Sequence, residues 1–319
     1  MKIYNLAFLL LFLFPFGSNE ALEFPASSPI TDSQQKLDRN KSGVVNIVFK
    51  STDGGQTWQD ISEGLPENLQ VGGFFANDSG VYLRAGNGIY HSKPNCTAPF
   101  WKKEMFPDEH CMQISQSYQG QCLDGQFLQK IDGTNVWVRT VFQTAGGTVF
   151  IGSDKGLFKS TNSGKTWKHV DTGSWVMKLV ESNGVLLATS QGGILRSTDD
   201  GENWDWVISE GGVGIAVERI KGGFAAITYS TESKTRRVRT SYDGGQTWQP
   251  IDADLPASLS IASIIQVGEY FFCGHPTGIF RSSDKGKTWN LLLPTIENKV
   301  FNLSVSGNVI YAIPRDGGC

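Results

Sequence analysis

One eight-residue pattern occurs five times along the chain and constrains the fold more than any other feature. The pattern reads Ser-x-Asp-x-Gly-x-Thr-Trp, with one Asn in place of Asp and one Asn in place of Thr. Its conserved positions in the five copies are Ser51, Asp53, Gly55, Trp58; Ser160, Asn162, Gly164, Trp167; Ser197, Asp199, Gly201, Trp204; Ser241, Asp243, Gly245, Trp248; and Ser282, Asp284, Gly286, Trp289. Such a regular recurrence predicts a repeat architecture.

Each copy is expected to form a tight turn between two strands. The carboxylate at the third position can accept hydrogen bonds from the turn amides that follow it. The glycine at the fifth position can adopt a positive φ without a steric penalty. The tryptophan begins the returning strand and can cover part of the neighbouring sheet. We therefore interpret these residues as structural, and their regularly spaced carboxylates as unrelated to catalysis.

The spacing of the tryptophans predicts the number of repeats. The last four copies end at tryptophans that are 37, 44 and 41 residues apart. The longer gap between Trp58 and Trp167 holds a degenerate copy that ends at Trp101. Alternating apolar residues predict two more strands before each turn, for example over 175–180 and 185–189. Four short antiparallel strands in about 40 residues are typical of a propeller blade.

The two ends of the chain predict how the repeat closes. The chain begins with the outer half of a blade, over 44–50 and 58–61, and finishes with an inner half, over 300–305 and 309–313. Pairing these halves completes one blade and leaves no unpaired end of the chain. We therefore predict an all-β fold, a six-bladed β-propeller of four-stranded antiparallel blades. Its N-terminal outer strands would pair with its C-terminal inner strands.

The N-terminal segment has the pattern of a secretory signal peptide. Lys2 precedes an apolar stretch over 7–16 that is too short to span a bilayer, and Ala21 offers a cleavage site. We therefore expect a signal peptide over 1–21, a linker over 22–42 and a propeller over 43–319 with an inserted loop at about 105–135. The mature protein is expected to be secreted or periplasmic, without a transmembrane segment.

Charge and cysteine content exclude several classes of function. The formal net charge of −3 excludes an electrostatic nucleic-acid binder. The five cysteines show no zinc-ligand spacing, so we expect neither a metal nor another cofactor. Cys111 and Cys122 are disulfide candidates, and Cys96 could compete for either of them. Since one of five cysteines stays unpaired in a single chain, we expect Cys319 to be that residue.

The repeated residues resemble the Asp-box, or bacterial neuraminidase repeat, and the chain resembles that β-propeller superfamily over roughly 43–319. The superfamily includes sialidases, xyloglucanase-type hydrolases, sortilin-type receptors and photosystem II assembly-factor-like propellers. In its repeat pattern, the chain most resembles the assembly-factor-like and sialidase-like members. The assembly-factor-like propellers, however, usually have seven blades. The resemblance implies that the boxes lie on the face opposite the usual ligand site. It is specific for the fold and says little about activity.

The predicted ligand face carries the turns between the second and third strands and the connections between blades. Its candidate binding residues are Arg84, Asn87, Asp154, Lys155, Trp175, Gln191 and His275. Arg84, Asp154, Trp175, Gln191 and His275 could surround one pore mouth. The basic run from Lys234 to Arg239 is expected to be a solvated hairpin.

A sialidase-like glycoside hydrolase is the alternative function. The sialidase resemblance requires an early Phe-Arg-Ile-Pro segment and an arginine triad for the substrate carboxylate. The segment is absent, and Ile313-Pro314-Arg315 has the reverse order at the wrong end of the chain. We therefore expect a non-catalytic, monomeric binding module without catalytic residues. Its partner would be a protein or a glycan.

Overall fold

The computed structural model describes residues 46–316, except 68, 86–87, 94–100, 106–126 and 171–172. In these ranges the regular elements are all strands, and no helix could cross a membrane. The predictions for several residues and segments lie outside the described residues. These are the signal peptide, the linker, Asn87, Cys96, Cys111, Cys122 and Cys319.

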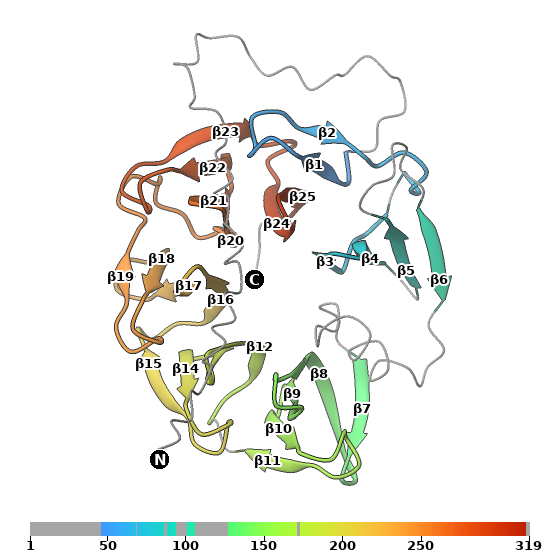
Figure 1. The fold of residues 1–319 in the computed structure, drawn as a ribbon, viewed down its shortest axis with the longest axis vertical. Helices are drawn as coiled ribbons and strands as arrows, with labels where there is room; N and C mark the ends of the chain where they lie inside the picture. Colours follow the sequence, from blue (N-terminus) through green and yellow to red (C-terminus); the bar gives the residue numbers. More distant parts are fainter. Residues whose placement is uncertain are drawn as a thin grey trace, which may run out of the picture.

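The strands form six sheets arranged as blades around a central axis (Figure 1). Blade 1 contains β24 (Val300–Ser306), β25 (Val309–Arg315), β1 (Phe49–Ser51) and β2 (Gln59–Asp60). Blade 2 contains β3 (Gly73–Asn77), β4 (Gly80–Ala85), β5 (Gly88–Ser92) and β6 (Lys102–Met105). Blade 3 contains β7 (Phe127–Ile131), β8 (Thr134–Gln143), β9 (Val149–Ser153), β10 (Gly156–Ser160) and β11 (Lys168–Val170).

The remaining three blades have four strands each. Blade 4 contains β12 (Val176–Ser182), β13 (Val185–Ser190), β14 (Gly193–Ser197) and β15 (Asp205–Ile208). Blade 5 contains β16 (Gly214–Ile220), β17 (Gly223–Ser230), β18 (Thr235–Ser241) and β19 (Gln249–Pro250). Blade 6 contains β20 (Ser263–Val267), β21 (Tyr270–His275), β22 (Gly278–Ser282) and β23 (Asn290–Pro294). The prediction of a six-bladed, all-β propeller is confirmed.

Closure of the ring is confirmed in blade 1. The N-terminal strand β1 pairs with the C-terminal strand β25, with Phe49 opposite Ala312 and Ser51 opposite Ile310. The sheet order β2-β1-β25-β24 therefore joins an outer half from one end of the chain to an inner half from the other. Both Phe49 and Ile310 are buried in the same apolar cluster. This pairing covers the inner edge of β1 and the outer edge of β25, which would otherwise both be unpaired.

Blade 3 differs from the expectation of four strands, because β7 adds a fifth. β7 and the first half of β8 form a hairpin, with Ile131 opposite Thr134. Asp132 and Gly133 both have positive φ, 46° and 84°, as a two-residue type I′ turn requires. Ile131, Val136 and Val138 are buried, so the hairpin belongs to the folded domain. The loop expected at about 105–135 therefore contains regular structure from residue 127 onward.

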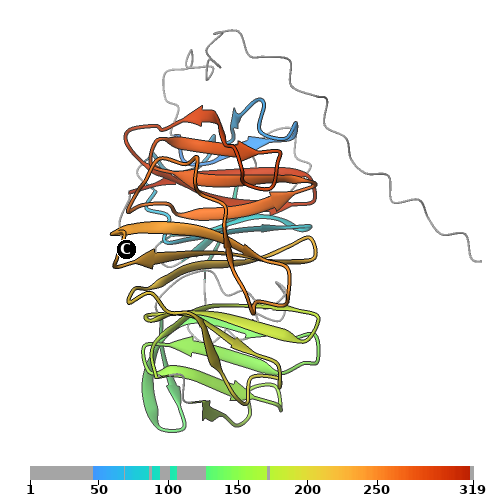
Figure 2. The same ribbon diagram turned by 90° about the vertical axis from the view of Figure 1, so that its left-hand side faces the viewer.

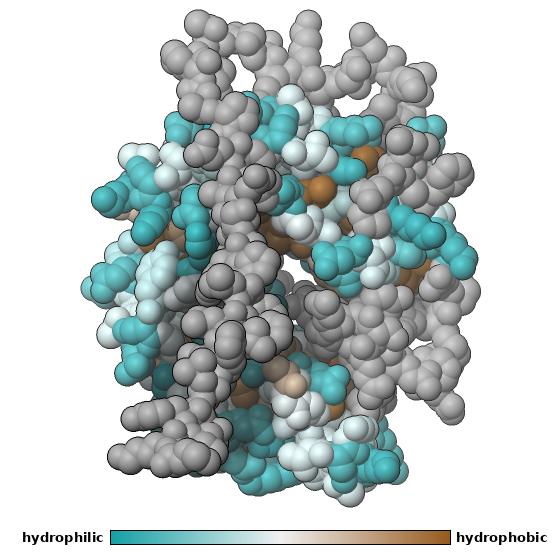
Figure 3. Space-filling view, in the orientation of Figure 1, coloured by the Kyte–Doolittle hydropathy of each residue, from teal (hydrophilic) through white to brown (hydrophobic). Residues whose placement is uncertain are grey.

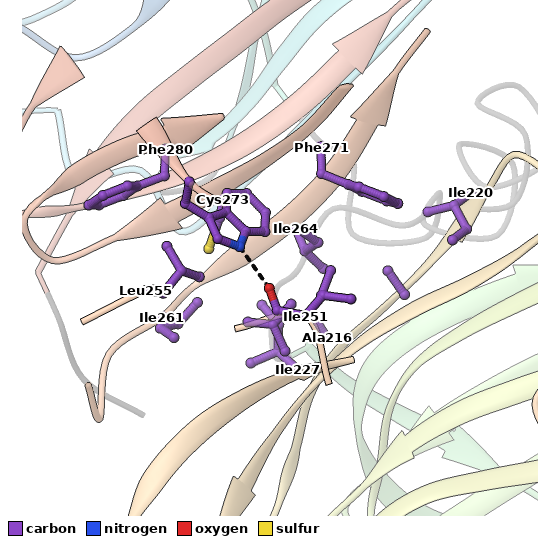
Figure 4. Packing of buried hydrophobic residues seen from close by; sticks show 13 residues of the cluster. Ala216, Ile220, Ile227, Ile251, Leu255, Ile261, Ile264, Phe271, Cys273 and Phe280 are labelled. Carbon is purple, nitrogen blue, oxygen red and sulfur yellow. Dashed lines mark hydrogen bonds between the residues drawn. The ribbon is translucent and has the colours of Figure 1, made fainter. Parts of the chain in front are cut away.

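The cores lie between adjacent blades, and Figure 2 shows the blades from the side, with their strands running across the view. In the space-filling view, hydrophilic residues dominate the described surface and hydrophobic ones are recessed between them (Figure 3). The core cluster between blades 5 and 6 contains Phe271, Cys273 and Trp289 (Figure 4). Cys273 is a buried free thiol. The apolar core encloses this thiol, whereas the expectation that Cys319 is unpaired concerns a residue outside the described ones.

Tryptophan indoles connect some blades directly. Trp289 Nε1 donates a hydrogen bond of 2.7 Å to the carbonyl oxygen of Ile251, which is drawn as the dashed line in Figure 4. Trp101 makes the corresponding bond to Ile61, at 2.9 Å. Ile251 and Ile61 occupy equivalent places after the boxes of blades 5 and 1. Because Trp101 and Trp289 donate to equivalent carbonyls, this contact supports the interpretation of Trp101 as the end of a degenerate copy of the box.

The box turns share one set of hydrogen bonds, which the first copy shows. Ser51 Oγ donates to Asp53 Oδ1 at 2.9 Å and accepts from the Gly55 amide at 2.8 Å. Asp53 also accepts from the amide and the hydroxyl of Thr57, at 3.0 and 2.5 Å. The fourth and fifth residues, Gly54 and Gly55, both have positive φ. The turn is therefore held by its own side chains.

Candidate functional site

The turns alternate between the two faces of the propeller, because successive strands in each blade are antiparallel. The box turns follow the third strand of a blade and lie on one face. The turns after the second strand, and the connections that enter the next blade, lie on the opposite face. We call this opposite face the loop face. The strands run from side to side in Figure 2, so the two faces lie at its left and right.

Arg84 ends β4 on the loop face and packs against the connection that enters blade 2. The Gly72 amide donates to the Arg84 carbonyl at 2.8 Å. A Cβ at Gly72 would lie only 2.6 Å from Arg84 Nη2, so the absence of a side chain allows this contact. Arg315 Nη2 donates to the Gly72 carbonyl at 3.3 Å. Two guanidinium groups therefore contact one glycine on this face.

His275 ends β21 and is 2% exposed, so little of it can contact a ligand. Its Nδ1 lies 3.1 Å from the Thr277 amide, which donates to it. Its Nε2 lies 2.9 Å from the Pro256 carbonyl and donates to that oxygen. Burial lowers the pKa of His275, and the neutral form satisfies both contacts. The geometry favours a structural role for His275.

Asp154 lies in the turn between β9 and β10 and holds the hairpin of blade 3. Its Oδ1 accepts from the Trp137 amide at 2.8 Å, and its own amide donates to the Trp137 carbonyl at 3.2 Å. Lys155 is exposed next to it, with Nζ 3.8 Å from Asp154 Oδ2. Gln191 is exposed in the corresponding turn of blade 4. Lys155 and Gln191 therefore remain accessible, whereas Asp154 positions Trp137.

Two exposed tryptophans and one arginine form a cluster on the loop face. Trp137 is 47% exposed and Trp175 is 41% exposed. The guanidinium carbon of Arg139 lies 4.6 Å from the centroid of the Trp175 ring, a cation–π contact between blades 3 and 4. Alternating burial along β8 places Trp137 and Arg139 on the same side of the strand. We call Trp137, Arg139 and Trp175 the tryptophan cluster.

The tryptophan cluster is fixed by contacts of the backbone. Ser190 Oγ donates to the Trp175 carbonyl at 2.6 Å, where Trp175 enters blade 4. Asp154 holds Trp137 through two hydrogen bonds, one accepted from the Trp137 amide and one donated to the Trp137 carbonyl. Arg139 Nε is buried and has no hydrogen-bond partner among the described residues. The cluster is therefore a pre-formed surface, which lowers the cost of ordering side chains on binding.

The basic run of blade 5 is not the solvated hairpin that was expected. Arg236 and Arg239 are both buried. Arg236 Nη1 donates to the Ile261 carbonyl at 2.8 Å, and Arg239 Nη2 pairs with Glu210 Oε1 at 2.5 Å. Arg237 donates to both carboxylate oxygens of Asp252, at 2.8 and 3.1 Å, which raises its pKa. These arginines connect blade 5 to the segments around it.

Several acidic side chains on or near the loop face have structural partners. Glu210 and Asp252, in the connections before and after blade 5, pair with arginines of that blade. Among the described residues, no group of three or more His, Cys, Asp or Glu could hold a metal ion.

Trp137 and Arg139 were not among the residues predicted from the sequence. Both follow the segment over 105–135 that was interpreted as an irregular loop, and no strand bounds were assigned to the residues directly after it. The sequence Ile131-Asp132-Gly133-Thr134 is a strong hairpin signal and could have revealed them. The contact of Arg139 with Trp175 joins two blades, so it depends on the assembled ring.

Comparisons with known proteins agree with this architecture. A family model described as BNR/Asp-box repeat matches residues 49–60 and 239–250. No curated protein sequence matches the chain. A GH74 xyloglucanase from Xanthomonas campestris is structurally similar, with a TM-score of 0.59 and 14% identity. The similarity covers 82% of this chain and 53% of that enzyme, so this chain spans about half of its length.

Two other similar structures are more distant. PorZ from Porphyromonas gingivalis has a TM-score of 0.42 and 12% identity, over 74% of this chain and 29% of PorZ. YCF48 bound to a D1 peptide has a TM-score of 0.36 and 13% identity, over 78% of this chain and 95% of YCF48. The xyloglucanase similarity, at this identity, shows the fold alone. The chain is thus a six-bladed β-propeller built from BNR/Asp-box repeats.

Proposed function

We propose that the chain is a non-catalytic binding module whose partner, a protein or a glycan, contacts the loop face. The observation that carries the proposal is the tryptophan cluster, where Trp137 and Trp175 remain exposed and Arg139 contacts the Trp175 ring. Tryptophan and arginine are the residues most enriched among those that dominate binding energy. Two exposed indoles on one pre-formed surface contribute little to folding, whereas they suit recognition.

Three carboxylates in loop-face turns and connections have structural partners, which supports a non-catalytic role for each of them. Most glycoside hydrolases need two carboxyl groups that flank the scissile bond, one of which is a proton donor. Asp154 holds the Trp137 backbone, Glu210 pairs with Arg239, and Asp252 pairs with Arg237. Carboxylates that hold neighbouring residues in this way are poor candidates for a group that must gain and lose a proton during turnover.

Affinity capture and a glycan array with the purified full-length mature protein test the proposed function. The Trp137→Ala/Trp175→Ala variant should lose the partner that the wild type binds. Tyr242→Ala is the matched control, because Tyr242 is an exposed aromatic residue in the box of blade 5, on the opposite face. Steady hydrolysis of a glycoside by the wild type would contradict the non-catalytic role. Equal binding by all three proteins would contradict the assignment of the loop face.

We also propose that the protein is exported and acts as a monomer. Export rests on the N-terminal pattern of Lys2, the apolar stretch over 7–16 and Ala21. Mass spectrometry of protein collected outside the cytoplasm should find Leu22 as the first residue. Light scattering of that material should give the mass of one chain. Retention of residues 1–21, or a dimer mass, would contradict the respective proposal.

A further inference from the structure

A third exposed tryptophan lies on the same face as the tryptophan cluster. Trp206 of β15 is 43% exposed. Its ring covers Gly192, in the turn between β13 and β14, where a Cβ would lie 2.8 Å from Trp206 Cη2. This turn follows the second strand of blade 4 and therefore belongs to the loop face. Gly192 allows the indole to lie on the turn with the rest of the ring exposed to solvent.

The three tryptophans follow one another across two neighbouring blades. Trp137 lies on the hairpin of blade 3, Trp175 enters the inner strand of blade 4, and Trp206 lies on its outer strand. Arg139 connects the first two, and the turn Gln191-Gly192 lies between the strands that carry the last two. We call Trp137, Trp175 and Trp206 the tryptophan strip.

We propose that the tryptophan strip binds a glycan chain, with successive sugar rings packed on the indoles. This inference rests on the proposed function and specifies the class of ligand. The C–H bonds on one face of a pyranose ring carry partial positive charge, and the face of an indole carries partial negative charge. A sugar ring can therefore stack on each indole, while its hydroxyl groups point sideways to hydrogen-bonding groups of the protein.

The polar groups beside the strip fit such a ligand. Arg139 is half-buried with its guanidinium over the Trp175 ring, and guanidinium N–H groups can donate to sugar hydroxyls. The exposed amide of Gln191, between Trp175 and Trp206 along the chain, can both donate and accept. Alternating rings and polar groups match the alternating C–H faces and hydroxyls of a sugar chain.

The distribution of apolar side chains favours a glycan over a protein partner. The central part of a protein–protein interface is usually a continuous apolar patch. The exposed large aliphatic residues of the described chain, Leu259 and Leu291, lie on the connection between blades 5 and 6 and on blade 6. Near the strip, the large exposed apolar residues are the three tryptophans. Isolated rings separated by polar groups suit saccharide stacking better than a protein interface.

Binding to a glycan array of plant, microbial and animal saccharide chains tests this inference, with the full-length mature protein as probe. Titration calorimetry then compares the chain that binds best with its monosaccharide. Trp137→Ala, Trp175→Ala and Trp206→Ala should each weaken binding of the chain about tenfold or more, as expected for a central aromatic contact. Tyr242→Ala should leave the affinity unchanged, since Tyr242 is 53% exposed on the opposite face. The chain should bind at least about tenfold more tightly than its monosaccharide, because several rings contribute.

Three outcomes overturn the inference. The first is that no glycan on the array is bound by the wild type. The second is that a glycan is bound equally well by all variants. The third is that a purified protein partner, rather than a glycan, loses its binding in Trp137→Ala and Trp175→Ala. This third outcome leaves the proposed function intact, whereas a wild type that binds neither a glycan nor a protein contradicts both proposals.

Discussion

Arg281 donates a hydrogen bond from Nη1 to the carbonyl oxygen of Gly54, at 3.0 Å, across 227 residues of sequence. Arg281 directly precedes the box of blade 6, and Gly54 lies in the box of blade 1. Arg196 makes the same contact from blade 4 to the box of blade 5, with Nε 2.7 Å from the Gly244 carbonyl. The basic residue before one box therefore holds the box of the next blade. The bond of Arg281 connects the last and first blades of the ring.

Loss of this contact should destabilise the closed ring. We expect Arg281→Ala to lower the free energy of unfolding by about 1–2 kcal/mol, because the Gly54 carbonyl loses a charged donor. Urea denaturation measures the change. Lys287→Ala, at an exposed position in the same blade, is the control and should change stability by no more than about 0.5 kcal/mol. An equal effect of both substitutions would contradict the role of Arg281 in closure.

The five box tryptophans are not equivalent. Trp289 is buried and bonds to Ile251 of the preceding blade, whereas Trp248 is half-buried and donates to Gly245 within its own box, at 3.1 Å. We expect Trp289→Ala to cost on the order of 3–5 kcal/mol, the range for buried aromatic residues. Trp248→Ala should cost clearly less, because less of its surface is removed from solvent. Urea denaturation of the two variants checks the order, and the reverse order would contradict this explanation.

Truncation after Pro294 should prevent stable folding. It removes β24 and β25, and with them the buried residues Phe301, Ile310 and Tyr311. β1 would then lose the strand with which it pairs, and the inner edge of blade 1 would be open. Circular dichroism and thermal unfolding test this expectation, with a chain ending at Asp316 as control. A cooperative transition for residues 1–294 that matches the control would show that closure is dispensable.

The parts of the fold that could be predicted depend on local patterns. Blade number and closure follow from the repeated box and from the half-blade at each end. The hairpin around Asp132-Gly133 was missed, although its turn signal is local, because the segment was interpreted from its loop-like composition. Burial of Arg239 was not predictable, since its partner Glu210 lies in a connection distant in sequence. The tryptophan cluster likewise requires two blades to be assembled.

The box carboxylates titrate at unusually low pH. Hydrogen bonds from the amide and side chain of Asn203 lower the pKa of Asp199 from 3.8 to about 2. Bonds from the amide and hydroxyl of Thr288 lower the pKa of Asp284 to about 2. Between about pH 4 and pH 2, these two carboxylates are ionised in the folded chain but largely protonated in the unfolded chain. Their contribution to stability is therefore complete above pH 4 and is lost as the pH falls from about 4 to about 2.

The second copy of the box shows how this pH dependence can be removed. Asn162 replaces the carboxylate, yet its Oδ1 accepts from the Thr166 amide at 3.0 Å and its Nδ2 donates to Thr166 Oγ1 at 2.8 Å. We expect Asp284→Asn to keep these turn bonds and to unfold like the wild type at pH 7. Between pH 4 and pH 2.5 its melting temperature should fall less steeply than that of the wild type, because the substituted amide does not titrate. Thermal unfolding across this range tests the expectation, and parallel curves for the two proteins would show that the Asp284 carboxylate contributes nothing to acid sensitivity.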